Sequence, residues 1–238
     1  MRLIFVRHAE PDYELDSLTE KGFREADILA GRTAKWKPDA VYCSPMGRAQ
    51  ATMRPSLKNW PDIKPVTYDW LKEFHYRIKD PEDGHERIAW DFMPRYFCYD
   101  ENLHNKDKWF ATDFMQAGDV QKHFEETKQG IDELLDGYGY HHRGNGLFDI
   151  DRSCDKTLVF FCHFGITSVI TSYLTGMAAP LLWQGFFMAP TAVTVFNSEE
   201  REEGMGAFRA QCFGDTRHLS KAGEPISHSG YFADVFED

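Results

Sequence analysis

Two short hydrophobic runs that each end at a histidine are the strongest pattern along the chain. Residues 2–7 (RLIFVR) run into His8, and residues 157–162 (TLVFFC) run into His163. Short runs of apolar residues without polar alternation are typical of strands buried in a parallel sheet. The same kind of pattern predicts four more strands, at residues 39–43, 64–71, 192–197 and 207–213, with the last two forming a hairpin around a charged turn at 198–206.

Segments with helical periodicity alternate with these strands. Apolar residues recur at helical spacing after Thr19, whose hydroxyl suits an N-cap, and after Ser44-Pro45, where serine can cap a helix that proline begins. Two further helices are predicted, one over residues 119–135 and one directly after His163. Strands that alternate with helices favour an α/β fold. We therefore predict a three-layer α/β/α sandwich with a mostly parallel central sheet.

The middle of the chain has a different character. Residues 74–150 are rich in aromatic and charged side chains and show no clear strand pattern. We interpret residues 81–114 as a helical or irregular insertion and residues 141–146 (HHRGNG) as a flexible turn. The chain is thus expected to form one domain, residues 1–238, with a lid insertion at about residues 76–154 near the strand ends. The polar tail at 220–238 is expected to run along the surface.

Composition narrows the function classes. Hydrophobic residues make up 42% of the 238 residues, enough for a core, and the formal net charge of −11 argues against a nucleic-acid partner. No apolar run is long enough to span a membrane, and the N-terminus begins as a strand rather than a signal peptide. We therefore expect a cytoplasmic protein with no membrane partner. The sequence leaves a homodimer open.

Metal and redox chemistry have little support in the sequence. The five cysteines are scattered and form no CxxC pair: residues 43, 98, 154, 162 and 212. The pair His141-His142 has no third ligand at a suitable spacing. We expect neither a metal site nor a cofactor.

Cationic and imidazole side chains follow three of the predicted strands. Arg7 and His8 end the first strand, His163 ends the later one, and Arg48 lies in the first turn of the helix after residues 39–43. Ligands bind at the carboxyl ends of strands in open α/β sheets. A guanidinium group can hold two phosphate oxygens, a helix N-terminus favours an anion, and a neutral imidazole is a competent nucleophile. The pattern predicts a phosphate pocket that contains its own nucleophile.

Five short motifs occur in a fixed order along the chain: RHAE at 7–10, LTEKG at 18–22, SPMGRAQAT at 44–52, LKE at 71–73 and HFG at 163–165. Together they resemble the histidine phosphatase superfamily, in the phosphoglycerate-mutase-like branch. The resemblance covers about residues 1–75 and 155–220. It implies that His8 is the residue that becomes phosphorylated. It further implies that Arg7, Arg48 and His163 bind the phosphoryl group, and that Glu73 is the proton donor.

Structural roles compete with these assignments. Arg48 is also compatible with a surface ion pair and His163 with a buried core histidine. Competitors of Glu73 for the acid role are Glu10 and three carboxylates of the insertion: Asp80, Glu82 and Asp83. Arg77, Arg87 and Arg95 are candidates for contact with a second anionic group of the substrate, although solvated ion pairs explain them as well.

Features that this sequence lacks indicate which branch of the family it resembles. Mutase-type members carry an Arg-Arg pair in the insertion, and no such pair occurs in this sequence. Acid phosphatases and phytases of the other branch have Asp directly after the late histidine, where this chain has Phe164. We therefore predict a metal-independent phosphomonoesterase that acts on a small phosphorylated metabolite through phospho-His8. The alternatives are a phosphomutase and a non-catalytic regulatory protein that binds phosphate esters.

Overall fold

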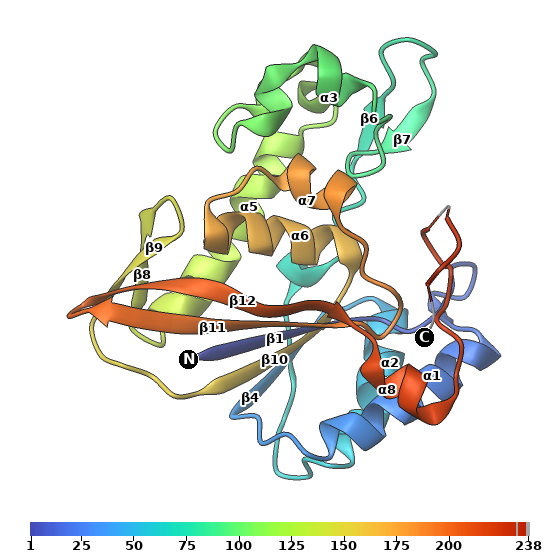
Figure 1. The fold of residues 1–238 in the computed structure, drawn as a ribbon, viewed down its shortest axis with the longest axis vertical. Coiled ribbons are helices and arrows are strands. Elements are labelled where there is room, and N and C mark those ends of the chain that lie inside the picture. The colour runs from blue at the N-terminus through green and yellow to red at the C-terminus, as the bar shows by residue number, and fades with distance from the viewer. Residues whose placement is uncertain (232, 237–238) are drawn as a thin grey trace.

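The fold is built on one large mixed sheet, seen edge-on across the middle of Figure 1. The computed structural model describes residues 1–231 and 233–236. In that part of the chain the sheet has eight strands in the order β5-β4-β10-β1-β11-β12-β9-β8. The α/β class predicted from the sequence is confirmed.

One half of the sheet is parallel and the other half antiparallel. The parallel half consists of β5 (Val66–Thr67), β4 (Ala40–Cys43), β10 (Thr157–Cys162) and β1 (Arg2–Arg7). The antiparallel half consists of β11 (Val193–Glu202), β12 (Met205–Asp215), β9 (Leu147–Ile150) and β8 (Tyr140–Gly144). The expected parallel arrangement thus holds for the half that carries the histidine-ended strands.

Helices cover both faces of the sheet and produce the three expected layers (Figure 1). One face packs against α1 (Glu20–Thr33) and α2 (Gly47–Leu57), with α8 (Arg217–Ala222) beside α1. The other face packs against α5 (Val120–Asp136) and α6 (Phe164–Thr175), and α7 (Ala179–Gly185) packs on α6.

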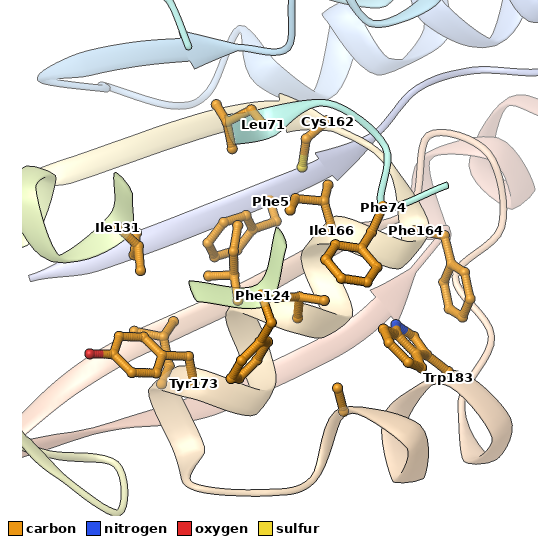
Figure 2. Packing of buried hydrophobic residues seen from close by; sticks show 14 of the residues in the cluster. Phe5, Leu71, Phe74, Phe124, Ile131, Cys162, Phe164, Ile166, Tyr173 and Trp183 are labelled. Atoms are coloured by element: carbon orange, nitrogen blue, oxygen red, sulfur yellow. The ribbon is translucent and has the colours of Figure 1, made fainter. Parts of the chain in front are cut away.

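The alternation of side chains along β1 shows why both faces are covered. Ile4 and Val6 pack toward α1 and α2, whereas Leu3 and Phe5 join the larger cluster on the α6 side. Figure 2 shows Phe5 among the buried side chains of this larger cluster, to which Phe124 also belongs. All four of these apolar side chains are almost fully buried. A strand that buries both faces cannot alternate polar and apolar residues, which explains the continuous run in the sequence.

Residues 76–118 form a separate group of short elements beyond α7, at the top of Figure 1. They comprise β6 (Arg77–Lys79), β7 (Glu86–Ile88), α3 (Tyr96–Tyr99), η2 (Glu101–His104), η3 (Trp109–Ala111) and α4 (Asp113–Gln116). Their aromatic side chains share one core with α7, because Trp109 lies 5.2 Å from Trp183, centroid to centroid. We call residues 76–118 the upper segment; its role as a lid stays a prediction.

Several local predictions from the sequence are wrong. Residues 64–71 hold only the two-residue strand β5, followed by η1 (Asp69–Leu71). Residues 141–146 are not a flexible turn, because β8 takes in His141 to Gly144 and pairs with β9. The charged residues 198–202 lie within β11, so the hairpin turn is shorter than expected. Each of these strands lacks a clear pattern because it is short, or polar at the edge or end of the sheet.

The sequence predicted two N-cap residues, Thr19 and Ser44, and the structure confirms only the first. Thr19 is the N-cap of α1 as expected, and its hydroxyl accepts the backbone N–H of Gly22 at 3.0 Å. Ser44 is not a cap, because α2 begins at Gly47, after Met46. In the part of the chain that the structure describes, no helix is both long and apolar enough to cross a membrane.

The cap at Thr19 gives a test of the fold. Its hydroxyl also donates to Oε1 of Glu10 at 2.9 Å, so it joins α1 to the loop after β1. Thr19→Ala is expected to lower the free energy of unfolding by about 1 kcal/mol in urea denaturation. The control is Thr175→Ala, since among the described residues that hydroxyl bonds only the Thr171 carbonyl within α6. A loss no larger than in the control would contradict the capping role.

Candidate active site

The residues selected from the sequence meet at the carboxyl edge of the parallel strands. His8 directly follows β1, and His163 directly follows β10 at the start of α6. The centroids of their rings are 5.0 Å apart. Arg7, Arg48 and Glu73 lie around this pair, and all five side chains are buried, with at most 8% of any residue exposed. The structure thus brings together the whole predicted set.

The ring of His8 is held in one orientation by the backbone. Its Nδ1 lies 2.7 Å from the carbonyl oxygen of Ala9. A carbonyl oxygen can only accept, so Nδ1 carries the proton and Nε2 keeps its lone pair. The Ala9 peptide is fixed in turn, because its N–H donates to Oγ1 of Thr52 at 2.9 Å. The nitrogen with nucleophilic character is therefore Nε2.

The two arginines reach the site from β1 and from α2, and they use only part of their donor capacity. Arg7 donates to the carbonyl oxygens of Met188 and, at 3.2 Å, of Ser229. Arg48 donates from Nη1 to Oδ1 of Asp16 at 2.7 Å. Among the described residues, Nε of each guanidinium is buried without a hydrogen-bond partner.

His163 is fixed through one nitrogen and leaves the other unpaired. Its Nε2 lies 2.7 Å from Oγ of Ser44. Its Nδ1 is buried and has no hydrogen-bond partner among the residues that the structure describes. Buried polar atoms are rarely left unpaired. Three such nitrogens belong to Arg7, Arg48 and His163, whose side chains neighbour His8, and they suit an anionic group with several oxygens.

Glu73 lies at the N-terminal end of α6. Its Oε1 accepts the backbone N–H of Phe74 at 2.7 Å and that of Ile166 at 3.1 Å. The second of these is one of the N–H groups that a helix leaves unpaired in its first turn. The carboxyl group is therefore held at a defined place beside the two histidines.

The competing carboxylates are engaged elsewhere. Glu10 accepts hydroxyl groups from Thr19 and Ser227. The three competing carboxylates of the upper segment form ion pairs with arginines of the same segment: Asp80 and Asp83 with Arg87, and Glu82 with Arg95. Arg87 and Arg95 are thus largely neutralised within the upper segment.

The chemical environment keeps both histidines of the site neutral. Burial, together with the charges of Arg7 and Arg48, lowers the pKa of His8 well below its ordinary value of 6.5. Burial, followed by the proximity of His8 and Arg48, lowers the pKa of His163 in the same direction. A lowered pKa means that the imidazole stays unprotonated over a wider range on the acidic side. A neutral ring is the form that can attack phosphorus.

Several residues at this site were missed by sequence reasoning or given another role. Asp16 pairs with Arg48 and also accepts the N–H of Gly47 at 2.6 Å, so its carboxylate sits where α2 begins. Ser44 holds His163 rather than capping a helix. Residues 227–231 were expected along the surface, but the Ser229 carbonyl reaches Arg7. Ser44 lies inside a quoted motif, whereas nothing local distinguishes Asp16 or Ser229.

The described residues contain no group of three or more His, Cys, Asp or Glu side chains arranged to hold a metal ion. Of the pair His141-His142 that was considered from the sequence, His141 forms hydrogen bonds with Asp136 and Asp151, at 2.7 and 2.9 Å.

Comparison with known proteins finds a match of one family model to part of the chain, and solved structures that share the fold. Residues 3–96 match the model of the histidine phosphatase superfamily (branch 1). A curated protein named "Putative phosphoserine phosphatase 2", from Hydrogenobacter thermophilus, is 24% identical over 231 residues, which cover 92% of this chain and 99% of that protein.

Solved structures with the same fold include two phosphatases. Phosphoserine phosphatase from Entamoeba histolytica, in complex with 3-phosphoglyceric acid, has a TM-score of 0.58 at 18% identity and covers 92% of this chain and 98% of its own. A mycobacterial glucosyl-3-phosphoglycerate phosphatase has a TM-score of 0.61 at 16% identity and covers 90% of this chain and 99% of its own.

The protonation states give a direct test of the site. In an NMR titration of the histidine rings, the signals of His8 and His163 are expected to show no protonation step at pH 6.5, the ordinary pKa of histidine, since both rings remain neutral there. The exposed His141 is the internal control, because hydrogen bonds to Asp151 and Asp136 raise its pKa above 6.5. Titration of His8 at or above 6.5 would contradict the described environment.

Proposed function

We propose that the chain is a member of the histidine phosphatase superfamily, whose model matches residues 3–96, and that it is a phosphomonoesterase that works through a phosphohistidine at His8. The observation that carries this proposal is the set of three buried, unpaired nitrogens on the side chains that neighbour His8, namely those of Arg7, Arg48 and His163. A phosphoryl group has three oxygens that accept hydrogen bonds, which matches two guanidinium groups and one imidazole. The substrate class is a small phosphorylated metabolite.

The first chemical step forms a phosphorus–nitrogen bond. Nε2 of His8 attacks the phosphorus atom while the bond from phosphorus to the ester oxygen breaks. Arg7, Arg48 and His163 hold the phosphoryl oxygens and balance their charge in a buried site, where such interactions are stronger than in bulk water. Glu73 gives a proton to the departing alkoxide, which leaves as the alcohol.

The second step returns the enzyme to its starting state. Glu73, now a carboxylate, takes a proton from a water molecule as the water oxygen attacks phospho-His8. The phosphorus–nitrogen bond breaks, and inorganic phosphate is the product. Two guanidinium groups supply the positive charge that a metal ion provides in other phosphatases, so we propose that the reaction needs no metal.

Binding of phosphate also has to displace contacts that the arginines make in the closed site. The Asp16 carboxylate occupies Nη1 of Arg48, and the Ser229 carbonyl occupies Nη2 of Arg7. Asp16 is half-exposed and can move away with its loop. We propose that the dianionic phosphate replaces this carboxylate at the start of α2, where the helix N-terminus favours an anion.

The nucleophile is tested by its removal. His8→Ala is expected to lower phosphate release by roughly 10³-fold or more, because the variant has no atom that can accept the phosphoryl group. Release of inorganic phosphate is measured in EDTA, with a panel of phosphorylated metabolites and an aryl phosphate. His141→Ala, at an exposed histidine, is the matched control and should keep full activity.

The outcomes of this experiment separate the alternatives. Full activity of His8→Ala would overturn the proposal, and loss of wild-type activity in EDTA would overturn metal independence. Transfer of the phosphoryl group to a second hydroxyl would identify a phosphomutase. Binding of phosphate esters with no turnover would identify a regulatory protein.

The proton donor is tested by a change that keeps its shape. The amide oxygen of Glu73→Gln can still accept the N–H groups of Phe74 and Ile166, but the side chain can neither give nor take a proton. We expect turnover of alkyl phosphates to fall by about 10²- to 10⁴-fold. With nitrophenyl phosphate, whose leaving group needs no proton, a burst of nitrophenol should precede a slow steady state.

The matched control for this variant is Glu82→Gln, which removes an exposed carboxylate of the upper segment. This variant should hydrolyse both substrates at the wild-type rate. Equal losses for the alkyl and the nitrophenyl ester, with no burst, would show that Glu73 is not the acid.

A further inference from the structure

The indole of Trp90 has an unpaired donor inside the site. Trp90 follows β7 in the upper segment, and its Nε1 is buried without a hydrogen-bond partner among the described residues. A tryptophan Nε1–H can only donate, so it needs an acceptor. A buried donor without one is unfavourable, and such groups are rare in folded proteins.

This donor lies next to the proton donor of the proposed reaction. Gly165 in α6 carries no Cβ, and a Cβ at that position would be 2.8 Å from Nε1 of Trp90 and 2.7 Å from Oε1 of Glu73. Both atoms therefore border the same point at the start of the helix. Because Glu73 serves the ester oxygen in the proposed reaction, Trp90 lies on the side of the leaving alcohol.

The indole is held in place from two sides. Its ring packs edge to face on Phe164, with centroids 5.5 Å apart. Gln184 in α7 holds the backbone around it, because its Nε2 donates to the carbonyl of Phe92 at 2.8 Å and contacts that of Trp90 at 3.5 Å. A donor positioned by two helices is preorganised, which is the property that a specificity contact requires.

The charges of the upper segment indicate what kind of acceptor fits. Arg87 is paired with Asp80 and Asp83, and Arg95 with Glu82, so these guanidinium groups are compensated before any substrate binds. A second phosphate group would need such cations. A single neutral N–H instead suits one oxygen, as in a hydroxyl or a carboxylate.

We propose that Nε1 of Trp90 donates a hydrogen bond to an oxygen on the leaving alcohol, close to the ester oxygen. The contact makes Trp90 a specificity-determining residue for phosphomonoesters whose alcohol carries a second oxygen. This inference rests on the proposed function for the orientation of the substrate. A site built to hydrogen-bond a substrate oxygen discriminates against the analogue that lacks it, because the buried donor is then left unpaired.

Two esters of similar size test the contact without any mutation. Hydroxyethyl phosphate has the second oxygen, whereas propyl phosphate has a methyl group in its place. The wild-type protein is expected to hydrolyse hydroxyethyl phosphate with a kcat/KM about tenfold higher, as one hydrogen bond allows. 3-Phosphoglycerate, measured beside them, separates a carboxylate acceptor from a hydroxyl.

Trp90→Phe removes the N–H and keeps an aromatic ring against Phe164. The variant is expected to lose about tenfold in kcat/KM for hydroxyethyl phosphate while propyl phosphate changes less than about twofold. Trp36→Phe, on the far side of the sheet near α1, is the matched control and should change neither value. Equal losses for both esters, or no loss for either, would overturn the proposal.

Binding provides a readout that does not depend on turnover. The dissociation constants of the two esters are measured by calorimetry with wild-type protein and Trp90→Phe. The same selective weakening for hydroxyethyl phosphate supports the contact even if no phosphate is released, in which case the proposed function alone fails. Equal affinities of both proteins for both esters, with normal turnover, would overturn the proposed role of Trp90. The proposed phosphatase activity would be unaffected by that result.

Discussion

Parallel pairing of β1 with β10 is the interaction on which the site depends. The register pairs Arg7 with Cys162, so the next residue of each strand, His8 and His163, emerges at the same edge of the sheet. Both strands are buried on both faces, and a slip by one residue would turn every side chain to the wrong layer. The packing of two hydrophobic runs therefore fixes the distance between two imidazole rings without any direct bond between them.

Burial of positive charge is the second constraint, and it links the fold to the chemistry. Two guanidinium groups and two imidazoles share a volume from which water is largely excluded, and the rings respond by remaining neutral. Within the protein, the Asp16 carboxylate and two backbone carbonyls compensate part of the cationic charge. A phosphoryl dianion would compensate the buried positive charge more completely. Burying two guanidinium groups therefore costs folding free energy but favours binding of the proposed ligand.

Sequence reasoning found the parts of the site that follow from local rules. Four of the site residues lie at strand or helix ends, namely His8, His163, Arg7 and Arg48. The carboxyl edge of a parallel sheet is where such ends meet. The residues it missed enter through tertiary contacts between segments far apart in the chain. Asp16 lies 32 positions before its partner Arg48, and Ser229 lies 222 positions after Arg7. No periodicity or cap signal encodes such a contact.

The errors in the predicted elements have a related cause. Strand β8 reads YHHRG, a polar sequence whose strand conformation is stabilised by pairing with β9 at the edge of the sheet. Strand β5 shrinks to two residues next to Pro65, which has no N–H to give to a neighbour. Long buried strands carry their own signal, whereas short strands depend on partners that the sequence pattern does not show.

The central claim is that His8 carries the phosphoryl group during turnover. The most direct measurement is peptide mass spectrometry on protein mixed with an excess of substrate and quenched in alkali, which preserves phosphohistidine. The account predicts the added mass of one phosphoryl group on the N-terminal peptide at His8, formed and lost at rates that match turnover. Steady hydrolysis with no phosphorylated peptide, or with the phosphoryl group on another residue, would contradict it.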